Sequence, residues 1–168
     1  MKKVYQTIVD RECGNCMQAT IASLFELTLE EVPNFIELGD EWHWRMMEFF
    51  KEKGYTDICT IYKNRHTTEQ LRNIAKFDGG VNGYHYAVVN SKIFEGGTHA
   101  LVVDSDLNIV HDVNPSETYL SCTPEDVIAV MVVHDMVIGK TGKCFTAEDW
   151  NNATEEERNL NTYKVDDK

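Results

Sequence analysis

The segment with the clearest chemical potential is Cys13-Gly14-Asn15-Cys16, a short polar turn that carries two cysteines. The residues after it place apolar side chains at the spacing of one helix face, as Met17, Ile21, Leu24 and Phe25. Asn15 is a residue type that commonly caps a helix, so Cys16 would be the first helical residue. The positive end of the helix dipole favours a thiolate there. The sequence therefore predicts Cys16 as a nucleophile.

A cysteine nucleophile needs a base, and His99 is the histidine that the sequence favours. It opens an expected strand over 98–104, and Asp112 lies in the next expected strand, 107–113. A loop of two or four residues between these strands would place Asp112 directly opposite His99, with Cβ atoms about 4.5–5.5 Å apart. A loop of three residues would shift this register by one. A carboxylate opposite the base holds one imidazole nitrogen and leaves the other for the thiol.

The other requirement is a pair of donors for the oxyanion of the tetrahedral intermediate. We expect the backbone N–H of Cys16 and the side-chain amide of Gln6, ten residues earlier, to supply them. Asn15 is a weaker candidate because it is expected to cap the helix. His85 also opens a strand and is the alternative base. Asp112 has a structural alternative too, as a turn-capping residue before Asn114-Pro115-Ser116.

The elements that must position these residues divide the chain into two halves. Helical spacing and capping residues predict helices over 16–27, 41–53 and 68–76. Dominance of β-branched residues predicts strands over 84–90, 98–104, 107–113 and 127–137, with an earlier strand over 57–62. A last helix is expected over 146–158. Helices followed by an antiparallel sheet indicate an α+β fold, with one domain over 1–160 and a flexible acidic tail over 161–168.

Composition limits the classes of function. The chain has 168 residues and a formal net charge of −12, so nucleic acid is an unfavourable partner and a basic or neutral substrate is favoured. No apolar run reaches the length of a membrane span, and the basic start is not followed by the apolar core of a signal peptide. The five cysteines are then expected to be reduced thiols in a cytoplasmic protein.

Two other classes can use this cysteine pair. A thiol redox protein has the spacing Cys13-x-x-Cys16, but that motif normally follows a buried strand, and here a polar-leaning segment precedes it. A zinc site of Cys13, Cys16 and two histidines lacks a second closely spaced ligand pair. We therefore expect no metal and no cofactor. The isolated cysteines, Cys59, Cys122 and Cys144, are expected to be structural.

The ordered set of motifs resembles the papain-like cysteine peptidase superfamily. Cys13-Gly14-Asn15-Cys16 is similar to the Cys-Gly-Ser-Cys-Trp run of papain, in which the second cysteine reacts. Further segments are similar to small bacterial and bacteriophage members, namely Tyr5-Gln6-Thr7, Ala22-Ser23-Leu24, Glu31-Val32-Pro33 and His111-Asp112-Val113-Asn114-Pro115-Ser116. The resemblance implies N-terminal helices, the first carrying Cys16, packed on a C-terminal antiparallel sheet. It also implies amide or thioester chemistry without a metal, on a protein or peptide substrate.

The resemblance has two departures and leaves three functions open. The distance from Gln6 to Cys16 is longer than in papain. In the more distant peptidase domains of bacteriocin-processing ABC transporters the reactive cysteine precedes a glycine, as Cys13 does here, which makes Cys13 the alternative nucleophile. The functions are a cysteine hydrolase with a Cys-His-Asp triad, a transglutaminase-like acyl transferase, and an inactive papain-like binding or inhibitor module. The oligomeric state and the substrate are not predicted.

Overall fold

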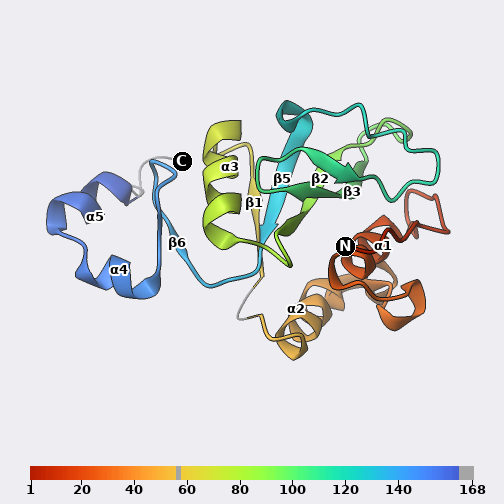
Figure 1. Ribbon diagram of the computed structural model, residues 1–168, viewed down its shortest axis with the longest axis horizontal. Coiled ribbons are helices and arrows are strands. Elements are labelled where there is room, and N and C mark those ends of the chain that lie inside the picture. The colour runs from red at the N-terminus through yellow and green to blue at the C-terminus, as the bar shows by residue number, and fades with distance from the viewer. Residues whose placement is uncertain (56–57, 163–168) are drawn as a thin grey trace.

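The centre of the protein is a five-stranded antiparallel sheet with the strand order β1-β5-β2-β3-β4 (Figure 1). The computed structural model describes residues 1–55 and 58–162. The strands are β1 (Cys59–Tyr62), β2 (Tyr84–Asn90), β3 (Thr98–Asp104), β4 (Ile109–His111) and β5 (Val127–Val132). With the helices around it, this sheet confirms the α+β class.

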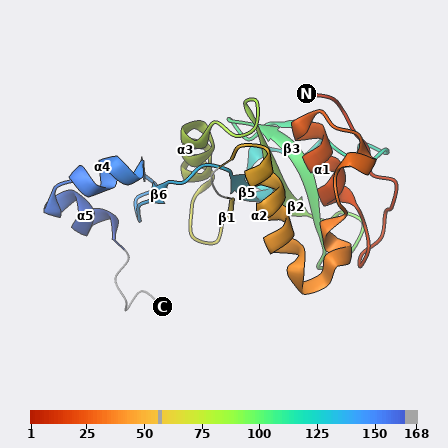
Figure 2. The same cartoon turned by 90° about the horizontal axis from the view of Figure 1, so that it is seen from below.

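Helices cover both faces of the sheet (Figure 2). The helices α1 (Cys16–Phe25) and α2 (Trp42–Glu52) lie on one face, joined by the short 3-10 helices η1 (Leu29–Glu31) and η2 (Phe35–Glu41). Helix α3 (Thr68–Asp78) lies on the other face. None of the helices over 1–55 and 58–162 combines the length and the apolar character that crossing a membrane requires.

The two faces of β3 pack into separate cores. Ala100 and Val102 belong to the core beneath α1 and α2, whereas Leu101 and Val103 belong to the core beneath α3. The alternation follows from the period of two in a strand. Burial on both faces explains why the central strands are continuous apolar runs in the sequence.

Most of the predicted elements are present, with shifts at their ends. The strands predicted over 84–90 and 98–104 match β2 and β3. The first helix ends at Phe25 rather than at residue 27, because Glu26 adopts the left-handed conformation with φ of 59°. The strand predicted over 57–62 begins at Cys59, and residue 57 lies outside the described residues.

The C-terminal part differs more from the prediction. It contains β6 (Val137–Ile138), β7 (Cys144–Phe145), α4 (Ala147–Asn152) and α5 (Glu155–Asn161), and it extends away from the main sheet (Figure 1). The strand predicted over 127–137 ends at Val132. The single helix predicted over 146–158 is two helices, because Ala153 has an extended backbone and Thr154 caps the second helix.

The predicted tail over 161–168 also needs a correction. Asn161 is the last residue of α5, and its side chain is buried and accepts a hydrogen bond from the hydroxyl of Thr141. Residue 161 is therefore part of the folded structure. Residues 163–168 of the predicted tail lie outside the described residues.

The hairpin between β3 and β4 determines the geometry of the site, and its predicted register was wrong. The N–H of Leu107 donates to Asp104 and that of Asp104 to Asn108, so three residues connect the strands, and Leu107 is left-handed with φ of 65°. Val103 then pairs with Ile109 and Val102 with His111, which makes Val110 an extra residue in a β-bulge.

The loop and the bulge act in the same direction. Each shifts the pairing by one residue, so together they shift it by two and return the side chains to the predicted face. Asp112, which follows β4 directly, is displaced along the strand from His99 rather than directly opposite it. The two side chains still share a face of the sheet and remain within reach of each other.

Candidate active site

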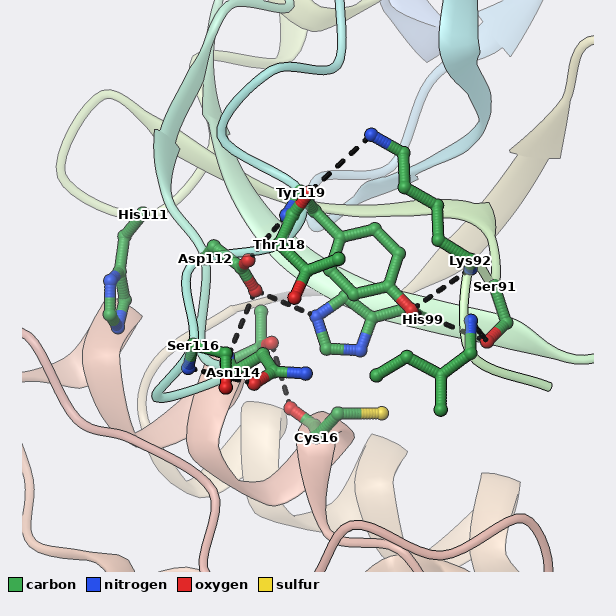
Figure 3. A network of polar contacts seen from close by, with 12 residues as sticks. Cys16, Ser91, Lys92, His99, His111, Asp112, Asn114, Ser116, Thr118 and Tyr119 are labelled. Carbon is green, nitrogen blue, oxygen red and sulfur yellow. Dashed lines mark hydrogen bonds and ion pairs between the residues drawn. The ribbon is translucent and has the colours of Figure 1, made fainter.

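Cys16, His99 and Asp112 meet where α1 begins beside the start of β3 (Figure 3). The imidazole Nε2 of His99 lies 2.9 Å from Oδ1 of Asp112. The other ring nitrogen is therefore left for the Cys16 thiol, whose charge interacts with that of His99. Figure 3 shows the sulfur on the side of the ring away from Asp112. The structure thus brings the three predicted residues together in the predicted order.

The turn before Cys16 is held by Asn15, the N-cap residue of α1. Asn15 makes no side-chain cap bond to α1. Its Oδ1 accepts from the N–H groups of Thr7 and Ile8 at 3.0 and 2.9 Å, and its Nδ2 donates to Thr7 Oγ1 and Gln18 Oε1. Asn15 thus holds the predicted N-cap position, and α1 begins at Cys16 as expected, but its side-chain amide is fully used by other partners.

Asn15 thereby folds the N-terminal segment back over the start of α1, and this places Gln6. The Gln6 side chain is buried and lines the same cavity as Cys16 and His99. Its backbone N–H donates to the carbonyl of Val113 at 2.8 Å. The long separation in sequence between Gln6 and Cys16 is taken up by the intervening loop, so the structure places Gln6 at the site.

Asp112 combines the two roles that the sequence left open. Its Oδ1 accepts from the Asn114 N–H at 2.9 Å, and its Oδ2 accepts from the Tyr119 N–H at 2.7 Å. The carboxylate is thus a turn cap as well as the partner of His99. These backbone bonds fix its position, and because it is buried it holds the imidazole in one orientation.

Tyr119 is a further part of the site that sequence reasoning missed. Its ring stacks on the His99 imidazole with centroids 4.0 Å apart and an interplanar angle of 13°. Its hydroxyl accepts from the N–H of Lys92 at 3.1 Å and lies 3.3 Å from Oγ of Ser91. No motif or spacing in the sequence marks this tyrosine. It is a positioning residue, since its stacked ring fixes the plane of the imidazole.

The surroundings shift the pKa values of Cys16 and His99 in opposite directions. Burial raises the pKa of Cys16, but the hydrogen bond with His99, the N–H groups of Ala100 and Met17, and the charge of His99 outweigh it and lower the pKa. Burial lowers the pKa of His99, but its bonds to Asp112 and Cys16 and their charges outweigh this and raise it. Both shifts favour a thiolate beside an imidazolium.

The pKa of Asp112 is also shifted so that its charged form is favoured. Burial raises the pKa of Asp112, and the hydrogen bonds from His99 and from the backbone N–H groups of Tyr119 and Asn114 outweigh this and lower it. Asp112 therefore stays ionised next to His99. An ionised carboxylate at this position stabilises the positive charge of the imidazolium.

The alternative residues lie elsewhere. Cys13 is exposed, and its thiol hydrogen bonds to Oδ1 of Asp10 at 3.3 Å, which raises its pKa. His85 lies opposite Val103, whereas His99 lies opposite Val89, so the two histidines are separated by about 13 Å along the strands at ~3.3 Å per residue. Neither Cys13 nor His85 takes part in the contacts around Cys16.

Two depressions meet at the Cys16 thiol. One is a small cavity of about 30 Å³, lined among others by Gln6, His99, Asn114 and Tyr119. The other is a groove of about 340 Å³, lined among others by Met17, Ile36, Tyr86, Val88 and Ala100. Cys16 is therefore accessible from both sides.

Within residues 1–55 and 58–162, no group of three or more His, Cys, Asp or Glu side chains is arranged to hold a metal ion. Cys13, Cys16, Cys122 and Cys144 are free thiols. A search against protein-family models, curated proteins and solved structures finds no match to this chain.

Proposed function

We propose that this chain is a papain-like cysteine hydrolase that cleaves an amide, isopeptide or related acyl bond through Cys16, His99 and Asp112. One observation carries the proposal: the His99 imidazole is hydrogen bonded to the buried Asp112 carboxylate, and its opposite side faces the Cys16 thiol at a helix N-terminus. A nucleophile, a base and an orienting group in contact are the parts that covalent acyl transfer needs.

The fold supports the same proposal. In the expected papain-like arrangement a helix carries the cysteine and packs on an antiparallel sheet that carries the histidine. Here α1 begins with Cys16 and contacts β3, and His99 is the second residue of β3. The papain-like assignment of the fold is part of the proposal.

The first step is acylation of the thiolate. The sulfur of Cys16 attacks the carbonyl carbon, and the carbonyl oxygen becomes an oxyanion stabilised by the Cys16 N–H and the Gln6 amide. The His99 imidazolium gives its proton to the leaving nitrogen, and the carbon–nitrogen bond breaks. Asp112 keeps the imidazole in the tautomer and orientation that this transfer needs.

The second step releases the acyl group. Neutral His99 takes a proton from water, the resulting hydroxide attacks the thioester, and the carbon–sulfur bond breaks to regenerate the thiolate and the imidazolium. A transglutaminase-like acyl transferase would share the first step and use an amine instead of water. An inactive binding module would require neither the lowered pKa of Cys16 nor the alignment of Asp112, so these features favour catalysis.

An activated ester tests the proposal without knowledge of the substrate. Incubation with p-nitrophenyl acetate, acid quenching and peptide mass spectrometry should locate an acetyl thioester on Cys16, because its lowered pKa favours the thiolate. Cys13→Ser should retain this labelling, and Cys16→Ser should lose the thioester. Equal acetylation of all five cysteines, or the same turnover by Cys16→Ala as by the unmodified protein, would contradict the proposal.

A further inference from the structure

The groove beside Cys16 contains a tyrosine hydroxyl that the fold does not use. Tyr86 lies in β2, and its ring belongs to the core beneath α1 and α2. Only 6% of this residue is exposed, yet it lines the groove together with Cys16. Its hydroxyl makes no hydrogen bond to another residue in the described part of the chain. A largely buried polar group without a protein partner is unusual in a native structure and calls for an explanation.

The hydroxyl reaches the groove and is not sealed inside the core. Among the described residues, the buried side-chain nitrogen and oxygen atoms that lack a hydrogen-bond partner belong to Asn34, His66 and His85. The hydroxyl of Tyr86 is not one of these atoms, so it keeps contact with solvent. Because Tyr86 meets the surface in the groove, its hydroxyl is directed there.

The groove offers this hydroxyl a defined chemical environment. Met17, Ile36 and Val88 line the groove with it, and their apolar side chains give it no partner. Burial and then the charge of Cys16 raise the pKa of Tyr86, so the phenol stays protonated at neutral pH and can donate. The charge of the thiolate also repels an anionic acceptor. The group that suits this hydroxyl is therefore a neutral acceptor such as an amide carbonyl.

The mechanism decides which part of the substrate occupies the groove. His99 gives its proton to the leaving nitrogen, and Gln6 binds the oxyanion. Both residues line the small cavity, and neither lines the groove. The leaving group and the carbonyl oxygen are therefore directed to the cavity. The remaining substituent of the carbonyl carbon, the acyl chain, is left for the groove that contains Tyr86.

We infer, on the basis of the proposed function, that Tyr86 is a specificity-determining residue whose hydroxyl donates to an amide carbonyl in the acyl part of the substrate. The acyl group transferred to Cys16 is then of the peptide type, with an amide near the reacting carbonyl, and not a plain aliphatic chain. The two covalent steps at Cys16 and His99 are unchanged by this contact.

Matched p-nitrophenyl esters test this inference. The hexanoate and N-acetyl-L-norleucine p-nitrophenyl ester share the leaving group and the aliphatic chain and differ in one acetamido group. A third ester, of N-acetyl-L-alanyl-L-norleucine, offers a second amide carbonyl further along the acyl part. Tyr86→Phe keeps the ring and removes the hydroxyl. Because each ester is compared between two proteins, its intrinsic reactivity cancels.

Tyr86→Phe should act on the amide-containing esters selectively. We expect the kcat/KM of at least one of them to fall about 3–10-fold relative to that of the hexanoate, as the loss of one hydrogen bond implies. Tyr62→Phe is the matched control, because Tyr62 is 55% exposed and does not line the groove. It should leave the ratios between the esters as they are in the unmodified protein.

Two results would overturn the inference. One is that both amide-containing esters keep their kcat/KM relative to the hexanoate in Tyr86→Phe. The other is an equal loss for all three esters, because the hydroxyl would then act through the fold or the thiol and not through the acyl part.

The test also separates this inference from the proposed function. If the protein forms the acetyl thioester at Cys16 but Tyr86→Phe gives either of these two results, the inference is wrong and the proposed function stands. If no acetyl thioester forms at Cys16, both are wrong.

Discussion

Two histidines of the main sheet each lie beside a buried aspartate from outside the strands, His99 beside Asp112 and His85 beside Asp78. In the first pair, Nε2 of the imidazole lies 2.9 Å from the carboxylate oxygen. In the second, Nδ1 lies 3.8 Å from it, beyond hydrogen-bonding distance, and this buried nitrogen has no hydrogen-bond partner among the described residues. A buried carboxylate beside a histidine is therefore not enough to define a base.

The two carboxylates also differ in what they support. Asp78 ends α3 and accepts from the backbone N–H groups of Gly80, Val133 and His134, so it ties the helix to the segment after β5. Asp112 accepts two backbone N–H groups and still directs Oδ1 at His99. The same two residue types, histidine and aspartate, stabilise the fold in one place and hold an imidazole in a fixed orientation in the other.

The titration of the histidines follows this difference. Burial lowers the pKa of His85, and the charges around it do not compensate, whereas the pKa of His99 is raised. The thiols show the same contrast. Burial and the charge of Asp78 raise the pKa of Cys144 to about 11, and the pKa of Cys16 is lowered. Of these two pairs, the one with Asp112 lies beside a thiol whose pKa is lowered.

The largest expected effect comes from exchanging the histidines for alanine. His99→Ala should lower the kcat/KM of p-nitrophenyl acetate hydrolysis by about 10²–10⁴-fold, because the base and its charge beside the thiolate are both lost. His85→Ala is the matched control and should retain the kcat/KM of its folded fraction. Equal losses in the two variants would show that the two pairs do not differ as described.

Substitutions of the two aspartates should separate stability from activity. Asp78→Ala leaves the buried N–H groups of Gly80 and Val133 without an acceptor and should lower the free energy of unfolding by about 1–3 kcal/mol in urea titrations. The kcat/KM per folded molecule should stay unchanged. Asp112→Asn should instead lower kcat/KM at a folded fraction matched by the same titration. A loss of activity without a loss of stability in Asp78→Ala would contradict the structural role.

The sequence predicted the central strands and the position of Cys16 at the start of α1 because these depend on local patterns. The apolar runs over 84–90 and 98–104 are long enough to mark both strands correctly. The position of Cys16 follows from the apolar stripe of α1, which begins directly after it. Both features are set by residues close together in the chain.

The features that failed depend on distant contacts or on backbone details. The side chain of Asn15 binds the segment over 7–8 instead of capping α1, and no local pattern reveals that partner. Leu107 takes a left-handed conformation in which glycine or asparagine is usual, so the three-residue loop had no signal. Tyr119 reaches His99 from a long irregular segment, where spacing carries no information about contact.

The rate of Cys16 alkylation by iodoacetamide, followed by mass spectrometry from pH 5 to pH 9, tests the central claim most directly. The lowered pKa predicts alkylation well below the pH at which an ordinary thiol, with a pKa of 9.0, ionises. In His99→Ala the profile should move to higher pH, because burial then acts with less opposition, and in His85→Ala it should stay in place. A Cys16 that reacts only near or above pH 9, with the same profile in all three proteins, would contradict a thiolate stabilised by His99.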